Sequence, residues 1–567
     1  MKNKLFINSI GTVLLAGAMV SCSSDYLDLS PETEIPTEDI ASDVTSLRSA
    51  TYGLFGNMYR QYSNLYDYRW FNGEPWLSMF YGEVPGQDYI CYFWINSHRQ
   101  VVNWEVMKDR NSNPNYIAWT YAYGIVGTAN TLIAGTSNVE ELDEEMKFRR
   151  AQCLTMRAHA YTRLLQIYGP RWTDSNNGEM LCIPLRLEPA DINGETGCPL
   201  SSMKDVMAAI YNDLDEAIAL FESTPSMGRT YEWETDIDVA RGLYARAAML
   251  KNDYVTAQKM AHDARAGYSI MTADEYQSGF AIPNGEWMWA SQTGPAGIYY
   301  ASFGASYACN GAYPTLWGSI GAGAIDVDLY RQLSPYDTRR QLFFTYDKGG
   351  LYLGAEDFYK AKNCNSASMN INRGDIKPQL LTFIQNQYNR LGAPNGWNPP
   401  YVSPTTGEVV QLVQYGAQFK FWGIDSYSSS QFPYMRASEM LYIEAEAAFY
   451  NGDESTALTL LNQMNQARCS RYRPSTASGE ALLNEIKISK RIELWGEGFS
   501  WFDMKRRGET MVRKPWVEND QTSGNWPSSM TSGDYSPESH NGWRWVIPDA
   551  EFQYNNMINY TELNYNE

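Results

Sequence analysis

The chain is 567 residues long, which is enough for a large hydrophobic core and for more than one ordinary domain. Its formal net charge is −20, so a basic surface for phosphate groups is not expected and nucleic acid is excluded as an expected partner. Aromatic residues make up 14% of the chain, with 18 Trp and 41 Tyr. These side chains join a flat apolar face to a polar group, which suits either packing between helices or a binding surface.

The first residues predict a secretion signal. Two lysines precede an apolar run over residues 10–20 that is too short to span a bilayer. The run ends in Met-Val-Ser-Cys, which resembles a bacterial lipobox with Cys22 as the acylated residue. We therefore expect residues 1–21 to be a lipoprotein signal peptide and residues 22–567 to be the mature chain. Several acyl chains on Cys22 would anchor it stably to a membrane. The alternative is an ordinary signal peptide followed by a chance cysteine.

Eight cysteines are spread along the chain, and no two of them have Cys-x-x-Cys spacing. A zinc ribbon and a thioredoxin-type redox site are therefore not indicated. Cys182 and Cys198 are the closest pair in sequence, but spacing alone cannot establish a disulfide bond.

Helical patterns dominate the first half of the chain. A helix is predicted over 37–60, beginning at Thr37 with two acidic residues in its first turn. Residues 62–104 follow neither the helical nor the strand period and contain many aromatic residues among Gly, Pro and Asn, so we predict an aromatic loop. Further helices are predicted over about 114–134, 143–168, 202–222, 238–250 and 253–267.

An internal repeat appears when the chain is shifted by 200 residues. Positions 245–257 match positions 445–457 at six of thirteen residues, most of them alanines. Both copies predict a helix, a tight turn and a second helix, and the alanines would let the paired helices approach closely. The pattern resembles a tetratricopeptide helical hairpin.

The segment between the two copies has a different composition. Residues 270–435 are rich in Gly, Asn, Tyr and Pro and lack sustained helical periodicity, which predicts short strands and loops. The segment is too long for a single connection and is expected to form a packed lobe. The predicted fold class is therefore mostly α, with a helical-hairpin scaffold over about 37–269 and 436–567 and an irregular lobe inserted over about 270–435.

A stretch near the C-terminus carries the most specific pattern. Large apolar residues recur on one helical face, at Ile488, Ile492, Trp495, Phe499 and Phe502. Two glycines, at positions 496 and 498, predict a break or a close backbone contact there. The order Arg-x-Glu-Leu, Gly-Glu-Gly, then Phe-Asp-Met-Lys-Arg resembles the C-terminal signature of the SusD/RagB family, which are surface lipoproteins that capture nutrients. This signature belongs to the scaffold and not to a binding site.

Other segments carry the same resemblance. The helix that ends at Gly169 has the family's Arg-Ala and aromatic pattern, and residues 432–441 resemble its Pro-x-x-Arg-x-x-Glu-x-x-Leu segment. Tyr-Leu-Asp soon after Cys22 resembles the start of a mature SusD-like chain. Residues 545–548 are similar to the family's terminal Pro-Ile-Pro-type strand, and the ending that normally follows it is degraded here.

Motifs for catalysis and for metal binding are missing from the sequence. It has four histidines but no His-Glu-x-x-His, no Gly-x-Ser-x-Gly and no phosphate-binding Gly-x-x-x-x-Gly-Lys. Ser201 and Lys204 fit a Ser/Lys nucleophile pattern in letters only, and Ser202 three residues before Asp205 predicts a helix cap. No carboxylate pair is singled out for glycoside hydrolysis. We therefore predict neither an enzyme nor a bound metal or cofactor.

The remaining candidates are aromatic. A sugar ring has an apolar face that stacks on Trp or Tyr, and hydroxyls that bond to Asn, Asp and Arg. One cluster includes Trp94, Asn96 and Arg99, and the other runs from Tyr299-Tyr300 through Tyr307 and Tyr313 to Trp317. The family resemblance implies a glycan site on an early loop and the middle lobe, with Trp94, Asn96, Arg99, Tyr300 and Trp317 as candidate ligand-binding residues. Core packing is the alternative for each aromatic.

The resemblance implies a lipid-anchored protein on the cell surface at the outer membrane. Its partners would be an oligosaccharide or polysaccharide and a SusC-like TonB-dependent transporter, to which it would deliver the glycan. Three alternatives remain open: the same scaffold binding peptides, a secreted hydrolase, and a structural surface lipoprotein without a ligand.

Overall fold

The structure is a computed structural model of the chain. The residues that it describes are 43–59, 73–91, 96–192, 197–292, 307–309, 319–320, 323–345, 368–371, 378–391, 411–424, 430–517, 520, 522–537 and 542–558.

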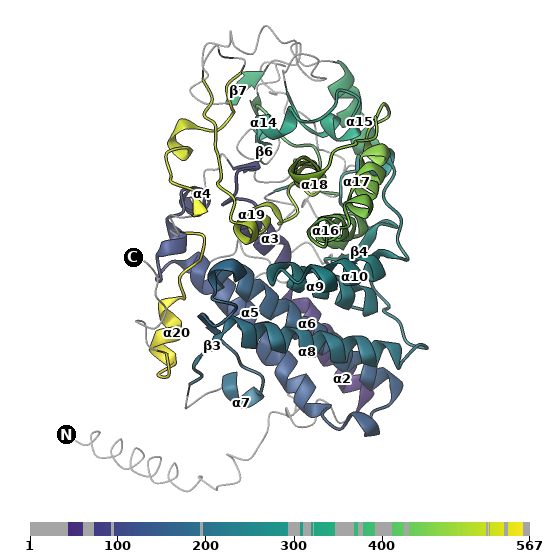
Figure 1. Ribbon diagram of the computed structural model, residues 1–567, viewed down its shortest axis with the longest axis vertical. Coiled ribbons are helices and arrows are strands. Elements are labelled where there is room, and N and C mark those ends of the chain that lie inside the picture. The colour runs from purple at the N-terminus through teal and green to yellow at the C-terminus, as the bar shows by residue number, and fades with distance from the viewer. Residues whose placement is uncertain are drawn as a thin grey trace, which may run out of the picture.

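Long helices stacked side by side form one half of the molecule (Figure 1). They are α2 (Val44–Asn57), α5 (Asn113–Gly135), α6 (Glu144–Tyr168), α8 (Met203–Glu222), α9 (Ile237–Leu250) and α10 (Tyr254–Arg265). Side chains of the residues just before them accept backbone N–H groups and fix where these helices begin: Asp43 caps α2, Asp143 caps α6 and Ser202 caps α8. The helices predicted from residue 114 onward and the Ser202 cap are confirmed, whereas the helix predicted over 37–60 begins only at Val44, because Asp43 is extended and caps it. Thr37 lies outside the described residues.

The two copies of the internal repeat have the same local structure. α9 and α10 form the first hairpin, and α16 (Ala437–Tyr450) and α17 (Glu454–Arg468) form the second. Asn252 and Gly452 occupy equivalent turn positions with φ of 58° and 83°. The aspartate that follows each caps the second helix of its hairpin. The repeat alanines are buried, and α10 packs on α16, so the hairpins are neighbours in one scaffold.

The C-terminal signature folds as two helices with a sharp break between them. α18 (Gly479–Glu493) and α19 (Ser500–Arg507) are separated by Gly496 and Gly498, with φ of 75° and 92°. A Cβ on Gly498 would lie 2.6 Å from the Cβ of Ser78. The glycines are needed for both the left-handed backbone and the close contact, so the predicted break is confirmed.

The inserted segment contains short strands and few long helices. β4 (Trp287–Ala290) pairs with β9 (Pro433–Arg436) where the lobe leaves and rejoins the scaffold. Its other strands are β5 (Ser319–Ile320), β6 (Ala324–Ile325), β7 (Ser368–Ile371) and β8 (Gln411–Gln414), and its helices are α11 (Ala273–Tyr276), α14 (Val327–Tyr330), η6 (Thr338–Leu342) and α15 (Pro378–Leu391). β8 joins β5 and β7 in a three-stranded sheet. The predicted fold class is confirmed.

Smaller elements fill the edges of the scaffold. They are α3 (Glu74–Gly82), β1 (Tyr89–Ile90), α4 (Asn96–Val102), η2 (Val106–Lys108), η3 (Val139–Glu141), η4 (Trp172–Asp174), β2 (Leu181–Pro184), α7 (Pro189–Ile192), β3 (Leu200–Ser202), η8 (Ser528–Met530) and α20 (Asp549–Tyr554). Cys182 and Cys198 lie near the β2–β3 pair and are both buried free thiols.

Two predictions of local structure were wrong. Residues 62–104 are not all aromatic loop, because the described part contains α3, β1 and α4, and Trp76, Phe80 and Tyr81 belong to the core. Every residue of α3 is buried, so the helix has no polar face that would reveal its period. Residues 545–548 form no strand. Trp545 and Val546 instead donate single backbone hydrogen bonds to Ile167 and Met107.

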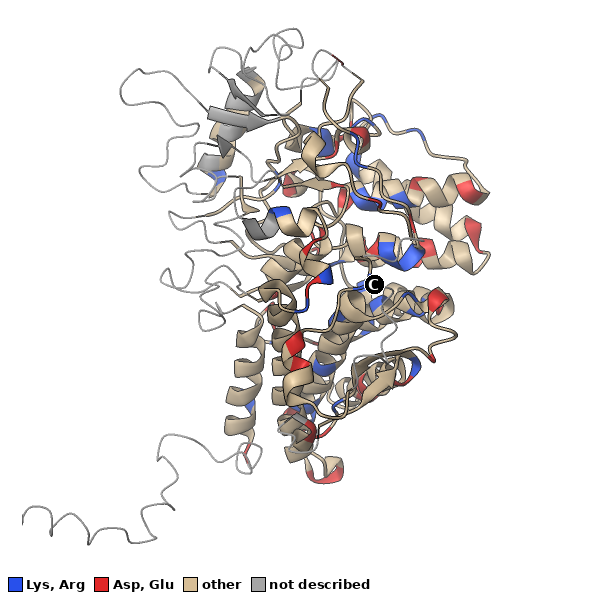
Figure 2. Cartoon of the chain, turned by 90° about the vertical axis from the view of Figure 1, so that its left-hand side faces the viewer, with Lys and Arg blue, Asp and Glu red and all other residues tan. Residues whose placement is uncertain are grey.

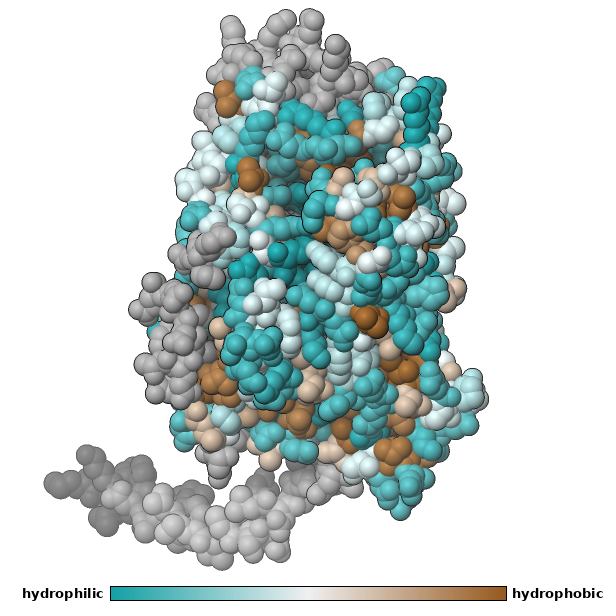
Figure 3. All heavy atoms as spheres, in the orientation of Figure 1, coloured by the Kyte–Doolittle hydropathy of each residue, from teal (hydrophilic) through white to brown (hydrophobic). Residues whose placement is uncertain are grey.

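Charged residues of both signs are spread along the described elements seen in Figure 2. Acidic and basic residues are interspersed through the helical half (Figure 2). On the face seen in Figure 3, hydrophilic residues cover most of the surface, and hydrophobic residues form small separate groups. None of the described helices combines the length and the apolar character needed to cross a bilayer.

Candidate functional site

The predicted ligand-binding residues fall mostly outside the described residues. Trp94, Tyr300 and Trp317 lie there, as does the predicted lipidation site, Cys22. Asn96 is the first residue of α4, but only its backbone is described. Arg99 lies on the same short helix with an exposed side chain. Whether these residues share one site therefore remains a prediction.

The described chain on either side of these residues does come together. β1 and β6 pair antiparallel, with Tyr89 opposite Ile325 and Ile90 opposite Ala324. Asp326 N also donates to Asp88 O at 3.0 Å. The early segment that leads to Trp94 and the lobe segment that follows Trp317 are thus neighbours in space, although more than 200 residues separate them in sequence.

Buried aromatic residues pack against the β1–β6 pair. The Trp495 ring of the C-terminal signature stacks on Tyr89 at 5.0 Å and meets Phe343 edge-on at 5.0 Å. Trp495 Nε1 donates to Asp88 O at 2.8 Å. Tyr307 packs against Tyr89 at 6.3 Å and is only 2% exposed. Tyr307 was predicted as part of a surface cluster, and this was wrong, because the residue fills the core beneath the junction.

A buried network of ion pairs joins the lobe to the scaffold. Arg436 bonds to Glu286, and its Nε lies 2.7 Å from Glu497 Oε2. Glu493 accepts from Arg468 at 2.9 Å and from Arg339 at 3.2 Å. The remaining members are Lys420, which lies 2.6 Å from Glu497, and Asp337, which pairs with Arg339 at 2.8 Å. Four cations therefore face four anions, so the network is neutral although water is excluded from it.

The network shifts the pKa values of its members in opposite directions. Burial alone would raise the pKa of Glu493, but Arg468, Arg436 and Arg339 outweigh it and hold that pKa well below its usual value. Burial lowers the pKa of Lys420 to about 8, although Glu497 opposes this shift. Part of this network had a signal in the sequence, since Glu493 and Glu497 belong to the signature stretch. The lobe partners Glu286 and Lys420 had none.

A second buried cluster, close to the β1–β6 junction, is acidic. Glu83 Oε1 accepts the N–H groups of Gly498 and Phe499 at 2.8 and 3.0 Å. Burial, reinforced by the nearby Asp88, raises the pKa of Glu83 to about 8. Burial likewise raises the pKa of Asp326 to about 7, with a further contribution from Asp88. The cluster therefore changes its protonation near neutral pH at a point where the signature break meets α3.

The described side chains show no cluster for a metal ion and no activated cysteine. No group of three or more His, Cys, Asp or Glu residues among them could hold a metal ion. The described cysteines are buried, and burial raises the pKa of Cys153 and Cys182 to about 12, which leaves both unreactive. His159 is buried 3.3 Å from Glu74, within the scaffold.

The cavities with described walls include the following two. One, of about 520 Å³, lies between α5 and the C-terminal α20. The other, of about 370 Å³, lies beside α17 and α18 and is lined by Asp337, Arg339 and Asn465, among others. Asp337 and Arg339 belong to the buried charge network, so the second cavity borders the ion pairs that join the lobe to the scaffold.

The fold is that of a protein with a helical-hairpin scaffold into which an irregular lobe is inserted. Residues 333–565 match the SusD family model, and a SusD-like protein of Bacteroides ovatus is 24% identical over 381 residues. That match covers 62% of this chain and 61% of the relative. Together these matches support a SusD/RagB family protein, with the family model confined to residues 333–565.

Solved structures agree with this assignment at the level of the fold. A protein of Bacteroides vulgatus described as a SusD-like carbohydrate binding protein is 19% identical, with a TM-score of 0.67 over 92% of this chain and 98% of that one. A SusD superfamily protein of Bacteroides thetaiotaomicron is 16% identical, with a TM-score of 0.63 over 91% of this chain and 99% of that one. Both similarities extend beyond the segment matched by the family model.

Proposed function

We propose that the protein is a glycan-binding lipoprotein of the cell surface. It captures an oligosaccharide or polysaccharide at the face formed by the early aromatic loop and the middle lobe, and it cleaves no bond in that ligand. The observation that carries the proposal is the β1–β6 pair, which joins these two parts of a SusD-family fold.

The ligand site follows from the position of that pair. Cys91 at the end of β1 is three residues from Trp94, and Ser319 is two residues from Trp317. We place Trp94 and Trp317 as stacking surfaces, Tyr300 beside them, and Asn96 and Arg99 as donors to sugar hydroxyls. The exposed side chain of Arg99 supports its role as a contact from α4.

The anchor and the partner are also proposals. Acylation of Cys22 would hold the protein at the outer membrane with its binding face outside the cell. A SusC-like TonB-dependent transporter would receive the glycan, and modest affinity would suffice because the anchor keeps the ligand near the pore. Residues 1–21, as a signal peptide, would be removed. The ligand lobe, about 270–435, would be one unit between the two parts of the scaffold.

The experiment is affinity electrophoresis of the soluble form that starts after Cys22, in gels that contain single polysaccharides. Trp94→Ala and Trp317→Ala are run beside the wild type, with Tyr231→Ala as the control because Tyr231 is an exposed aromatic of the helical scaffold. Retardation by one glycan, lost in both Trp variants but kept in the control, supports the function and the site. Retardation that persists in both Trp variants contradicts the site.

Two alternative functions predict different experimental results. Binding of peptides without retardation by any glycan would favour the peptide-binding alternative. Release of products that a single carboxylate substitution abolishes would favour a hydrolase. The described residues offer no observation that favours either.

A further inference from the structure

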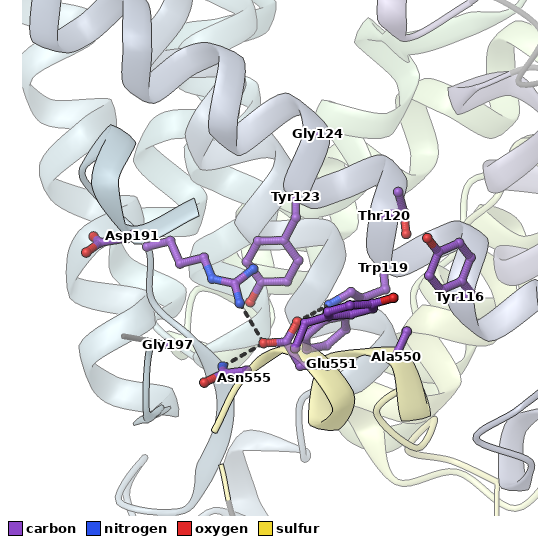
Figure 4. Close-up of a pocket in the computed structure, with 12 residues that line it drawn as sticks. Tyr116, Trp119, Thr120, Tyr123, Gly124, Asp191, Gly197, Ala550, Glu551 and Asn555 are labelled. Atoms are coloured by element: carbon purple, nitrogen blue, oxygen red, sulfur yellow. Dashed lines mark hydrogen bonds and ion pairs between the residues drawn. The ribbon is translucent and has the colours of Figure 1, made fainter. Parts of the chain in front are cut away.

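The larger cavity lies away from the β1–β6 junction. Its walls come from α5 on one side and from α20 and the segments around Arg186 and Gly197 on the other (Figure 4). Three aromatic residues of α5 line it, at positions 116, 119 and 123. Its volume of about 520 Å³ is within the range of ~300–1,000 Å³ that is typical of small-molecule sites.

Hydrogen bonds fix these walls in place. Glu551 of α20 accepts from Trp119 Nε1 at 3.0 Å, from Arg186 at 2.5 Å and from Asn555 Nδ2 at 2.7 Å (Figure 4). Asn555 also exchanges two hydrogen bonds with the backbone of Cys198, at 2.7 and 3.0 Å. The cavity is therefore preformed, and a ligand would not need to order it.

Every charged side chain in the lining is already paired with an opposite charge or accepts hydrogen bonds from the backbone. Arg186 is paired with Glu551 and lies over the Tyr123 ring at 4.6 Å. Asp191 Oδ2 accepts the N–H groups of Leu187 and Glu188, both at 3.0 Å. The lining thus offers no unpaired charge for an ion.

The outward face of α5 is unusual for a protein of this charge. The helix has no Asp, Glu, Lys or Arg over its 23 residues. Its positions that are not buried include four that recur every four residues, at Tyr116, Thr120, Gly124 and Thr128. Across the cavity, Tyr554 is 83% exposed. A solvated helix face normally carries charges, so this face is suited to a ligand that is neutral and has both apolar and hydroxyl surfaces.

We infer that this cavity is a second glycan subsite that holds one end or branch of a neutral sugar chain. Tyr116 and Tyr554 supply ring faces, and Thr120 supplies a hydroxyl. The inference rests on the proposed glycan binding and deepens it. One polysaccharide held at two separate points gains affinity through the raised local concentration of its second end.

The test is to fill the cavity with a large side chain introduced on α5. Gly124→Trp places a ring in the cavity without touching the Glu551 bonds, because nothing lies within 4 Å of a Cβ on Gly124. Gly53→Trp is the matched control, since Gly53 is also an exposed helix glycine with nothing within 4 Å. Tyr554→Ala is a second variant that removes an exposed ring of the lining and leaves the hydrogen bonds of Glu551 and Asn555 intact. Far-ultraviolet circular dichroism and thermal unfolding establish that each variant is folded.

The probes are neutral polysaccharides (amylopectin, xyloglucan, arabinoxylan and galactomannan) and a hexasaccharide cut from whichever one retards the wild type. We expect two hexasaccharides per wild-type chain by calorimetry and one in Gly124→Trp. The polysaccharide dissociation constant should rise about tenfold or more in Gly124→Trp and in Tyr554→Ala, and stay unchanged in Gly53→Trp.

Two outcomes overturn the inference. A wild type that binds one hexasaccharide, with Gly124→Trp indistinguishable from it, removes the second subsite and leaves the proposed function standing. Occupation of the cavity by a protein partner or by the chain's own last residues would give this same result. A wild type that binds none of the four polysaccharides contradicts the proposed function and the second subsite together.

Discussion

Replacing Glu493 by Gln should unfold the junction between lobe and scaffold more easily than any other single carboxylate change in α18. Glu493 is fully buried and accepts from Arg468 at 3.0 and 2.9 Å, from Arg339 at 3.2 Å and from Arg436 at 3.3 Å. The substitution turns a network of four cations and four anions into one with an excess positive charge away from water. Removing one partner of a buried ion pair costs about 3–5 kcal/mol.

The assay is urea unfolding of the soluble chain at pH 7, followed by tryptophan fluorescence, with Glu480→Gln as the control. Glu480 lies on the same helix with an exposed side chain, so its replacement should change the free energy of unfolding by no more than about 0.5 kcal/mol. The folded-state pKa of Glu493 is depressed, so its contribution is present above the unfolded pKa and is lost as pH falls. Equal unfolding free energies for the two variants would refute the account of the network.

Three other changes test separate parts of the structure. The folded-state pKa of Glu83 is raised from 4.5 to about 8, so the wild type should lose stability as pH rises between these values, and Glu83→Gln should flatten that slope in unfolding titrations; an unchanged slope counts against the raised pKa. Gly498→Ala should lower the free energy of unfolding by more than about 1 kcal/mol, because the φ of Gly498 is 92° and a Cβ there would clash with Ser78. Gly124→Ala should raise the free energy of unfolding by about 0.5–1 kcal/mol, because a Cβ there meets no neighbour. Thermal unfolding that ranks the two variants the other way contradicts the close contact at Gly498. Asp253→Ala should cost about 1 kcal/mol through loss of the cap on α10, and an unchanged melting temperature would show that the cap is dispensable.

Features encoded by neighbouring residues could be predicted from the sequence. The repeat was visible because its alanines and its turn-and-cap sequence recur within thirteen positions, and both turns proved equivalent in the structure. The break at Gly496 and Gly498 was predicted for the same reason. α3 was missed because every one of its residues is buried, which removes the contrast on which periodicity depends.

Features built from distant residues could not be predicted in this way. Arg436 meets Glu286 across 150 residues, and Arg186 meets Glu551 across 365. No local pattern links such partners, so neither the charge network nor the larger cavity had a sequence signal. Tyr307 illustrates the same limit for aromatic residues, since composition could not distinguish a buried ring from a stacking surface. The face with Trp94 and Trp317 rests on the family resemblance and on the β1–β6 pair.

Recognition of glycan without cleavage is the central claim, and one measurement tests it most directly. The soluble wild-type chain is incubated with the polysaccharide panel, and the same samples are assayed for retardation in a gel and for new reducing ends. We predict that one polysaccharide retards the protein strongly while its reducing ends do not increase over the incubation. Absence of retardation by every glycan, or an increase in reducing ends that depends on the protein, would contradict the account.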